Sequence, residues 1–318
     1  QSIPELVDNL DSRDRWLREQ SKRQLVTRDR LATIDALDHW TESITASAPK
    51  ASFQRLQALM MNETIERINE SLLTECLKAE DPRVRAYAAR TVGRWQDRIP
   101  QPLDFLKPLT EDPDYQVRLE VILACGNIPS SKSVAVASKA MRLPTDRWLD
   151  YGFTQTVRFL EPHWIPTLSS GTLDFGGNHD DLIRVIKAAR SKNLLQTVRQ
   201  LATNDSLDKV NQMAARLVLA NIGTKEDLRY LLDPNNYQIS SHYHARGQAN
   251  ILQAIVNSDR ARPVDDIGKK METFLTQRDP VLKLAAVKLA AHWEVKQTFA
   301  LVEKMATQGE RYTVLRHA

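Results

Sequence analysis

The sequence predicts an all-α fold of the α-solenoid type, an array in which antiparallel helix pairs stack one after another. Three observations lead to this prediction. A motif that begins with Asp-Pro recurs along the chain, and the apolar residues after it follow helical spacing. The composition, with only 10 glycines and 6% aromatic residues in 318, suits helices better than an all-β or dinucleotide-binding fold.

The Asp-Pro motif occurs three times, and each copy resembles the start of a helix. The copies are DPRVRAYAARTVGRW at 81–95, DPDYQVRLEVILACGNI at 112–128 and DPVLKLAAVKLAAHW at 279–293. Aspartate can cap a helix, and proline is tolerated in the first turn because its missing N–H leaves no hydrogen bond unmade there. Each copy therefore predicts a helix with a defined first residue.

The residues after these starts place their apolar side chains on one face. The expected stripes are Val84, Tyr87, Ala88, Thr91 and Val92; Leu282, Ala285, Ala286, Leu289 and Ala290; and, in a copy without Asp-Pro, Val210, Met213, Ala214, Leu217 and Val218. A helix of two to three turns cannot bury such a stripe alone, so it must pack against neighbouring helices.

An apolar, helix-like segment precedes these helices, as at 70–79, 102–110 and 269–277. Two helices joined by a short turn, at a period in the thirties to forties, are the signature of HEAT-type repeats. We expect one continuous HEAT-like domain over 1–318, with an irregular insertion near 161–181, and we expect the chain to be a fragment of a longer protein. About eight second helices should begin near Trp16, Phe53, Val84, Val117, Trp148, Val210, Ile239 and Leu282, and a ninth near Val314.

Charged residues recur at equivalent positions of the repeats. The acids are Asp81, Asp112 and Asp279, and the bases are Arg85, Arg118 and Lys283. They could form a basic stripe for phosphate contacts, or a ladder in which each carboxylate caps its turn and meets a base of a neighbouring unit. We favour the ladder, because both charges recur together and cancel.

The repeat pattern weakens between residues 143 and 181. The helix expected here keeps an apolar stripe, but it also carries polar and aromatic residues, and a glycine-containing stretch follows it. Such breaks are enriched in functional sites. We therefore place a possible partner-binding surface at Arg147, Trp148, Asp150, Tyr151 and Trp164. The alternative is that the two tryptophans are core residues of a longer repeat.

The same block carries a family resemblance. The segments TDRWLDYGFTQTVRFLEPHWIPTLSSGTLDF at 145–175, NLDSRDRWLREQSKRQL at 9–25 and RLQALMMNETIERINESLLTECLKAEDPRVRAYAAR at 55–90 resemble the HEAT-repeat region of large exported proteins of planctomycetes and related bacteria. In that family a β-propeller similar to membrane-bound sugar dehydrogenases precedes the repeats, and a c-type haem domain follows them. The resemblance implies an exported or periplasmic protein whose partner is a flanking domain or an external protein.

The chain lacks the sequence features that would carry chemistry in that family. It has no Cys-x-x-Cys-His for haem attachment and nothing similar to a propeller blade. It also has no glycine-rich phosphate loop, nucleophile elbow or zinc-protease motif. We therefore expect no catalytic, cofactor-binding or metal-binding residues here, no membrane span, and ordinary buried thiols at Cys76 and Cys125. The fragment should not be an enzyme.

A HEAT-like nucleic-acid-binding or DNA-glycosylase-type protein is the alternative function. The pI near 9.0, together with Trp148, Asp150 and Tyr151, keeps it open. Against it, 44 basic residues are balanced by 40 acidic ones, and phosphate binding requires a local excess of positive charge. A continuous Lys/Arg stripe on the repeat surface would favour DNA, whereas a mixed apolar and polar surface would favour a protein partner.

Overall fold

The computed structural model confirms the all-α class. It describes residues 1–45, 47–233, 236, 242–263 and 267–307, and within them every regular element is an α-helix or a short 3-10 helix. The chain forms two compact units, residues 1–176 and residues 177–318. None of the described helices is both long enough and apolar enough to cross a membrane.

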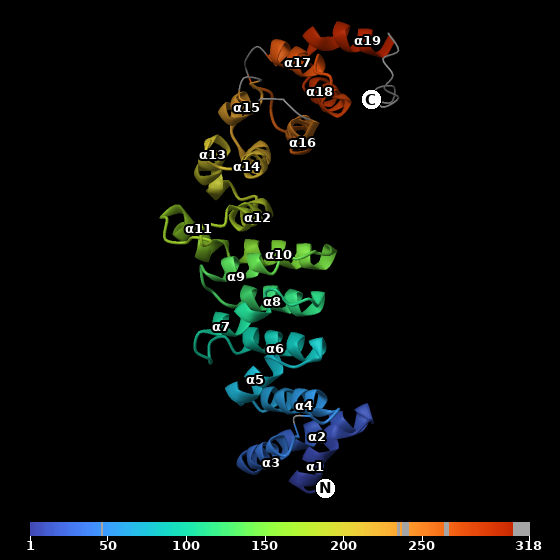
Figure 1. Ribbon diagram of the computed structural model, residues 1–318, viewed down its shortest axis with the longest axis vertical. Helices are drawn as coiled ribbons and strands as arrows, with labels where there is room; N and C mark the ends of the chain where they lie inside the picture. Colours follow the sequence, from blue (N-terminus) through green and yellow to red (C-terminus); the bar gives the residue numbers. More distant parts are fainter. Residues whose placement is uncertain (46, 234–235, 237–241, 264–266, 308–318) are drawn as a thin grey trace. The chain divides into compact units, whose positions relative to one another are not determined.

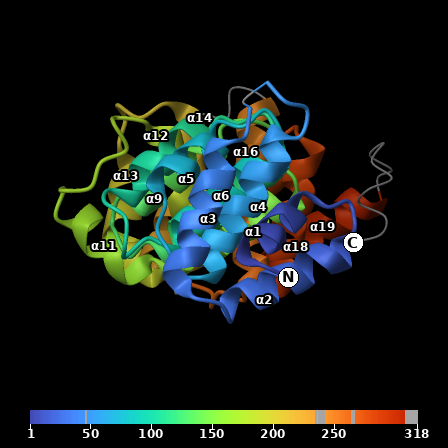
Figure 2. The same ribbon diagram turned by 90° about the horizontal axis from the view of Figure 1, so that it is seen from below.

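The first unit consists of two layers of helices (Figure 1). Its helices are α1 (Ile3–Asp8), α2 (Arg15–Val26), α3 (Arg30–Glu42), α4 (Ala51–Thr64), α5 (Glu70–Leu77), α6 (Pro82–Arg94), α7 (Pro102–Leu106), α8 (Tyr115–Asn127), α9 (Ser133–Lys139), α10 (Arg147–Phe159) and α11 (Glu161–Ser169). Helices α4, α6, α8 and α10 lie side by side in one layer, each in contact with the next. Figure 2 shows α5 and α9 together on one side of α6, in the second layer.

The second unit repeats this alternation. Its helices are α12 (His179–Ala189), α13 (Leu195–Thr203), α14 (Lys209–Ile222), α15 (Lys225–Leu231), α16 (His242–Asn257), α17 (Ile267–Leu275), α18 (Pro280–His292) and α19 (Phe299–Thr307). The even-numbered helices α12, α14, α16 and α18 contact one another in that order, and α13, α15 and α17 contact the even-numbered helices that follow or precede them. The helices from α12 to α18 therefore bury apolar residues against their neighbours, as an α-solenoid requires.

Seven of the expected second-helix starts lie within the first three residues of even-numbered helices. They are Trp16, Phe53, Val84, Val117, Trp148, Val210 and Leu282. The other two, Ile239 and Val314, lie outside the described residues. Helix α12 is a further even-numbered helix that the repeat pattern did not include, because it follows the irregular connection at 170–178.

Within the stretch expected to be an irregular insertion, residues 161–169 form α11 and residues 170–178 form a connection without helix. Gly171, Gly176 and Gly177 all adopt positive φ angles there. That conformation is readily available only to glycine, which explains why three glycines gather in this connection. The expectation of one continuous array over 1–318 remains a prediction.

Aspartate caps begin most of the even-numbered helices. Asp81 accepts the backbone N–H of Arg83, and Asp279 accepts those of Val281 and Leu282, so the Asp-Pro motif acts as expected at α6 and α18. At α8 the cap is different: it is Asp114, two residues after Asp112. Asp112 therefore does not cap the helix itself, but it accepts the backbone N–H of Asp114 at 2.9 Å and so caps the turn ahead of the helix, as the ladder hypothesis expected.

The expected stripes are buried in α6 and α18. Val84, Ala88, Thr91 and Val92 of α6 are buried, Tyr87 is half-buried, and all five stripe residues of α18 are buried. The stripe expected in α14 is wrong, since Val210 is 57% exposed.

In α14 the buried face is displaced by one residue and is partly polar. It includes Asn211 and Arg216, which find partners within the same unit. The Asn211 side chain donates to Asp180, and Arg216 donates to the Ala202 carbonyl. Buried polar groups are tolerated when they are hydrogen-bonded, so an apolar pattern alone gives the wrong register here.

Burial of a charge in a stripe should destabilise the array. Ala88 and Ala286 have no exposed surface, so Ala88→Asp and Ala286→Asp each place an unpaired carboxylate in the core. We expect each variant to lose about 3 kcal/mol or more of unfolding free energy in urea denaturation. Ala291→Asp, on the exposed face of α18, is the matched control and should cost less than about 1 kcal/mol. Wild-type denaturation of both buried variants would refute the assigned repeat register.

Candidate functional site

The basic residues of α6 are used within the repeat array. Arg85 makes two hydrogen bonds to Asp112, from Nε at 2.7 Å and from Nη2 at 2.9 Å, and it also donates to the Ala79 carbonyl. Asp112 is 27 residues further along the chain, so the pair joins neighbouring repeats. Hydrogen bonding to Asp112 raises the pKa of Arg85. Arg85 therefore stays charged and bound in place.

Two further arginines of α6 are engaged in the same way. Arg90 binds Glu120 on α8 through two nitrogens, and Arg94 donates to Glu63 on α4 at 2.7 Å. The Tyr87 hydroxyl donates to the same Glu63, and burial together with this hydrogen bond raises the pKa of Tyr87. Because Arg85, Arg90 and Arg94 each bind a carboxylate of a neighbouring repeat, and Arg83 binds Asp81 at the start of its own helix, α6 does not present a basic stripe for phosphates.

Arg118, another expected ladder base, has different surroundings. Arg118 is almost fully buried and donates to the carbonyls of Ala140 and Pro144, and its guanidinium lies 4.9 Å from the centre of the Tyr115 ring. The Arg118 side chain therefore binds backbone carbonyls after α9 rather than a carboxylate of the next repeat. Lys283 is buried in α18.

The polar and aromatic residues of α10 lie on its surface. Trp148 is 57% exposed and Tyr151 is 63% exposed, and Arg147 and Asp150 are also exposed. The guanidinium of Arg147 lies 4.6 Å from the centre of the Trp148 ring, a cation–π distance. Asp146 begins the helix by accepting the N–H of Trp148, and so fixes where the tryptophan leaves the backbone.

Trp164 does not belong to this surface, contrary to the sequence hypothesis. Its side chain has no exposed area, and its indole N–H donates to the Val157 carbonyl at 2.9 Å. Helix α11 begins directly after α10 and turns back onto it, which places Trp164 in the core. For this residue the alternative interpretation, a core tryptophan, agrees with the structure.

The sequence hypothesis did not include two further apolar residues of the exposed surface. Phe159, in the last turn of α10, is 73% exposed, and Leu123 of α8 is 42% exposed. Residues 148, 151 and 159 share one side of the helix, because steps of three and eleven residues nearly complete whole turns. We call Trp148, Tyr151, Phe159 and Leu123 the α10 face.

Leu123 belongs with this surface because of how α8 meets α10. A Cβ atom placed on Gly152 would lie 3.7 Å from a methyl group of Leu123, so this side chain of α8 packs beside Gly152, the residue after Tyr151. The spacing of Trp148, Tyr151 and Phe159 is visible in the sequence, but the neighbouring Leu123 follows only from the helix packing.

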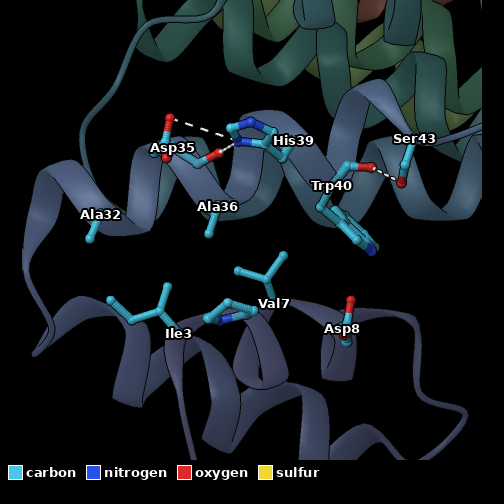
Figure 3. Close-up of a pocket in the computed structure, with 10 residues that line it drawn as sticks. Ile3, Val7, Asp8, Ala32, Asp35, Ala36, His39, Trp40 and Ser43 are labelled. Carbon is cyan, nitrogen blue, oxygen red and sulfur yellow. Dashed lines mark hydrogen bonds and ion pairs between the residues drawn. The ribbon is translucent and has the colours of Figure 1, made fainter.

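A hollow with a volume of about 610 Å³ lies between α1 and α3 (Figure 3). Its apolar lining is Ile3, Pro4, Val7, Ala32, Ala36 and Trp40. Asp35 and His39 lie at its rim, and a hydrogen bond to the Asp35 carbonyl raises the pKa of His39. Asp8 also lines the hollow, and the lining hydroxyl, Ser43, donates to the Trp40 carbonyl. The floor of the hollow is therefore mainly apolar, with polar groups around it.

The chain was compared with known proteins. A model of HEAT repeats matches residues 70–156, which run from the start of α5 into α10. A crystal structure of an engineered protein shares 18% identity over 97% of this chain and 95% of its own, with a TM-score of 0.40. No curated protein matches. The matched segment contains HEAT repeats, which generally mediate protein–protein interactions.

The described residues contain no cluster of histidine, cysteine or acidic groups that could hold a metal ion. Both cysteines are buried and unpaired. Burial raises the pKa of Cys76 to about 12 and raises that of Cys125 as well. The reactive thiolate form is therefore scarce at neutral pH.

This burial predicts slow thiol chemistry. In the native protein at pH 8, Cys76 and Cys125 should react with a disulfide reagent at least about 100 times more slowly than a free thiol. Both should react at once in 6 M guanidinium chloride, which serves as the control. Rapid labelling of the native protein would show that α5 or α8 opens frequently, contrary to the packing described here.

Proposed function

We propose that this chain is a non-catalytic protein-interaction scaffold and that the α10 face is a docking surface for a partner protein. The observation that carries the proposal is the exposure of three large aromatic side chains on a single helix, Trp148, Tyr151 and Phe159. Contiguous exposed apolar groups on a soluble protein mark interaction sites. Tryptophan, tyrosine and arginine also dominate the residues that contribute most binding energy at protein interfaces.

The rigidity of α10 supports this role. Its opposite side buries Leu149, Phe153 and Val157, and Gly152 lies tightly against Leu119 of α8. The exposed aromatic residues therefore stand on a fixed base and lose little freedom when a partner binds, which favours affinity.

A protein partner fits this surface better than a nucleic acid. Around the aromatic residues, α10 carries two exposed arginines, Arg147 and Arg158, and two exposed carboxylates, Asp150 and the capping Asp146, so the surface is mixed rather than basic. On α6, which packs against α8 on the side away from α10, Arg85, Arg90 and Arg94 are bound to carboxylates. A nucleic-acid surface would need an excess of positive charge that the residues near α10 do not supply.

Removal of the aromatic side chains should abolish docking without loss of stability. We expect Trp148→Ala together with Tyr151→Ala to weaken partner binding by at least about 30-fold, since such residues contribute about 2 kcal/mol or more at interfaces. The denaturation midpoint should change little, because both side chains are mostly exposed.

The measurement uses a photo-crosslinking amino acid, p-benzoylphenylalanine, in place of the exposed Gln155 on the same helix. In source cells this probe should give a discrete protein adduct that disappears in the double variant. Trp16→Ala is the matched control, because Trp16 is a similarly exposed tryptophan on α2, and it should leave the adduct unchanged. An adduct that persists in the double variant would refute docking at the α10 face.

We also propose that the scaffold works within an exported, dehydrogenase-like protein, where it holds a propeller and a haem domain at a fixed separation. The support is the resemblance of residues 9–25, 55–90 and 145–175 to the repeat region of such proteins. A stack of repeats suits this role because its length and curvature are set by the packing of neighbours.

This proposal predicts the properties of the native protein in its source cells. Antibodies raised against residues 1–318 should detect an exported protein that stains for covalently bound haem. The isolated chain should show neither haem staining nor turnover of sugars or alcohols with quinone acceptors. Detection of a cytoplasmic protein without haem would refute the proposed context and leave the docking proposal untouched.

A further inference from the structure

A polar pocket of about 400 Å³ lies on the second unit, among the even-numbered helices α12, α14 and α16. It is unlike the α10 face, because its lining contains carboxamides and cations rather than aromatic rings. The polar lining residues are Lys187, Arg190, Asn221, Asn250, Gln253 and Asn257. No aspartate, glutamate or aromatic residue lines it among the residues described.

The carboxamides come from two neighbouring helices. Asn250, Gln253 and Asn257 lie on one side of α16, since steps of three and seven residues bring side chains onto the same face. Asn221 of α14 lies across from them, and its amide donates to the Leu217 carbonyl, which fixes the direction of its oxygen. Gln253 donates to Asn257 at 2.9 Å, which leaves a carbonyl oxygen and an amide group available for a ligand.

The cations come from the end of α12. Lys187 lies in its last turn, and Arg190 ends the helix in a left-handed conformation with φ of 51°. Both side chains are exposed, and neither forms an ion pair with any carboxylate in the described part of the chain. They differ in this respect from Arg85, Arg90 and Arg94 of α6, each of which binds a carboxylate of a neighbouring repeat.

We propose that this pocket binds an extended, acidic segment of a polypeptide. A carboxamide offers one donor and one acceptor group, the pair that matches the N–H and C=O of an extended backbone. Lys187 and Arg190 can then pair with carboxylates of the segment, and Leu217, Val218 and Ala254 provide an apolar floor for its side chains.

The size and chemistry of the pocket favour a peptide over a nucleic acid. Helices packed side by side lie about 10 Å apart, so a ligand that crosses three of them spans about 20 Å, or about six extended residues. Single-stranded nucleic acids are held by stacking on aromatic rings and by many cations. This pocket supplies two cations and no ring.

The inference goes beyond the docking surface on α10 and rests on other residues. All the residues involved belong to the second unit, whereas Trp148 and Tyr151 belong to the first. The two proposals can therefore fail independently.

Fluorescence anisotropy with the whole chain tests the inference. The probes are a fluorescein-labelled 12-residue peptide of repeated Glu-Ser-Leu, the same peptide with Lys in place of Glu, and labelled dT12. We expect the acidic peptide to bind and the basic peptide not to bind. Lys187→Glu with Arg190→Glu should weaken the acidic peptide at least tenfold, and Asn250→Ala with Asn257→Ala should weaken it about tenfold.

Two controls separate this site from general electrostatic attraction and from the α10 face. Lys225→Glu with Lys296→Glu changes the net charge equally at exposed lysines of the same unit, and it should alter the affinity less than twofold. Trp148→Ala with Tyr151→Ala should bind the acidic peptide as the wild type does. Equal binding of both peptides, wild-type affinity in the carboxamide variant, or tighter binding of dT12 at the same residues would each overturn the inference.

Discussion

The close approach of α6 and α8 is the constraint on which the packing of the first unit depends. A Cβ atom at Gly93 would lie 2.8 Å from the Ala124 Cα, so only glycine permits this helix spacing. At this spacing Arg85 reaches Asp112 and Arg90 reaches Glu120. Small residues thus determine the geometry, and the ion pairs follow from it. The charged residues of these pairs recur at a regular interval in the sequence because the helices that they join recur at a regular interval.

The packing of α10 against α8 also depends on a glycine, and here it leaves an aromatic surface exposed. Gly152 of α10 meets Leu119 of α8, and the side of α10 that carries this glycine is buried. The large residues Trp148, Tyr151 and Phe159 lie on its exposed side. A residue that is too large for the interface between repeats is acceptable on the exposed face, where it becomes available to a partner.

The sequence predicted those features that depend on local interactions. Asp81 and Asp279 cap their helices through N–H groups two or three residues away, so a short motif contains the whole cause. The incorrect predictions depend on interactions between residues that are far apart in the sequence. Asn211 can be buried because Asp180, 31 residues earlier, accepts its hydrogen bond. The buried face of α14 therefore differs from the apolar stripe that the sequence predicts. Trp164 is buried because α11 turns back onto α10, which a periodic pattern cannot reveal.

Net charge says little about binding in such an array, because some of its cations pair with carboxylates of neighbouring repeats. Binding depends instead on which cations have no carboxylate beside them. Arg94 has Glu63 within 2.7 Å, whereas Arg190, at the end of α12, faces carboxamides instead of an acid. Each repeat contacts only its neighbours, so its exposed side chains can change without disturbing packing elsewhere. One fold can therefore carry an aromatic surface in one unit and an unneutralised polar pocket in another, each suited to a different partner.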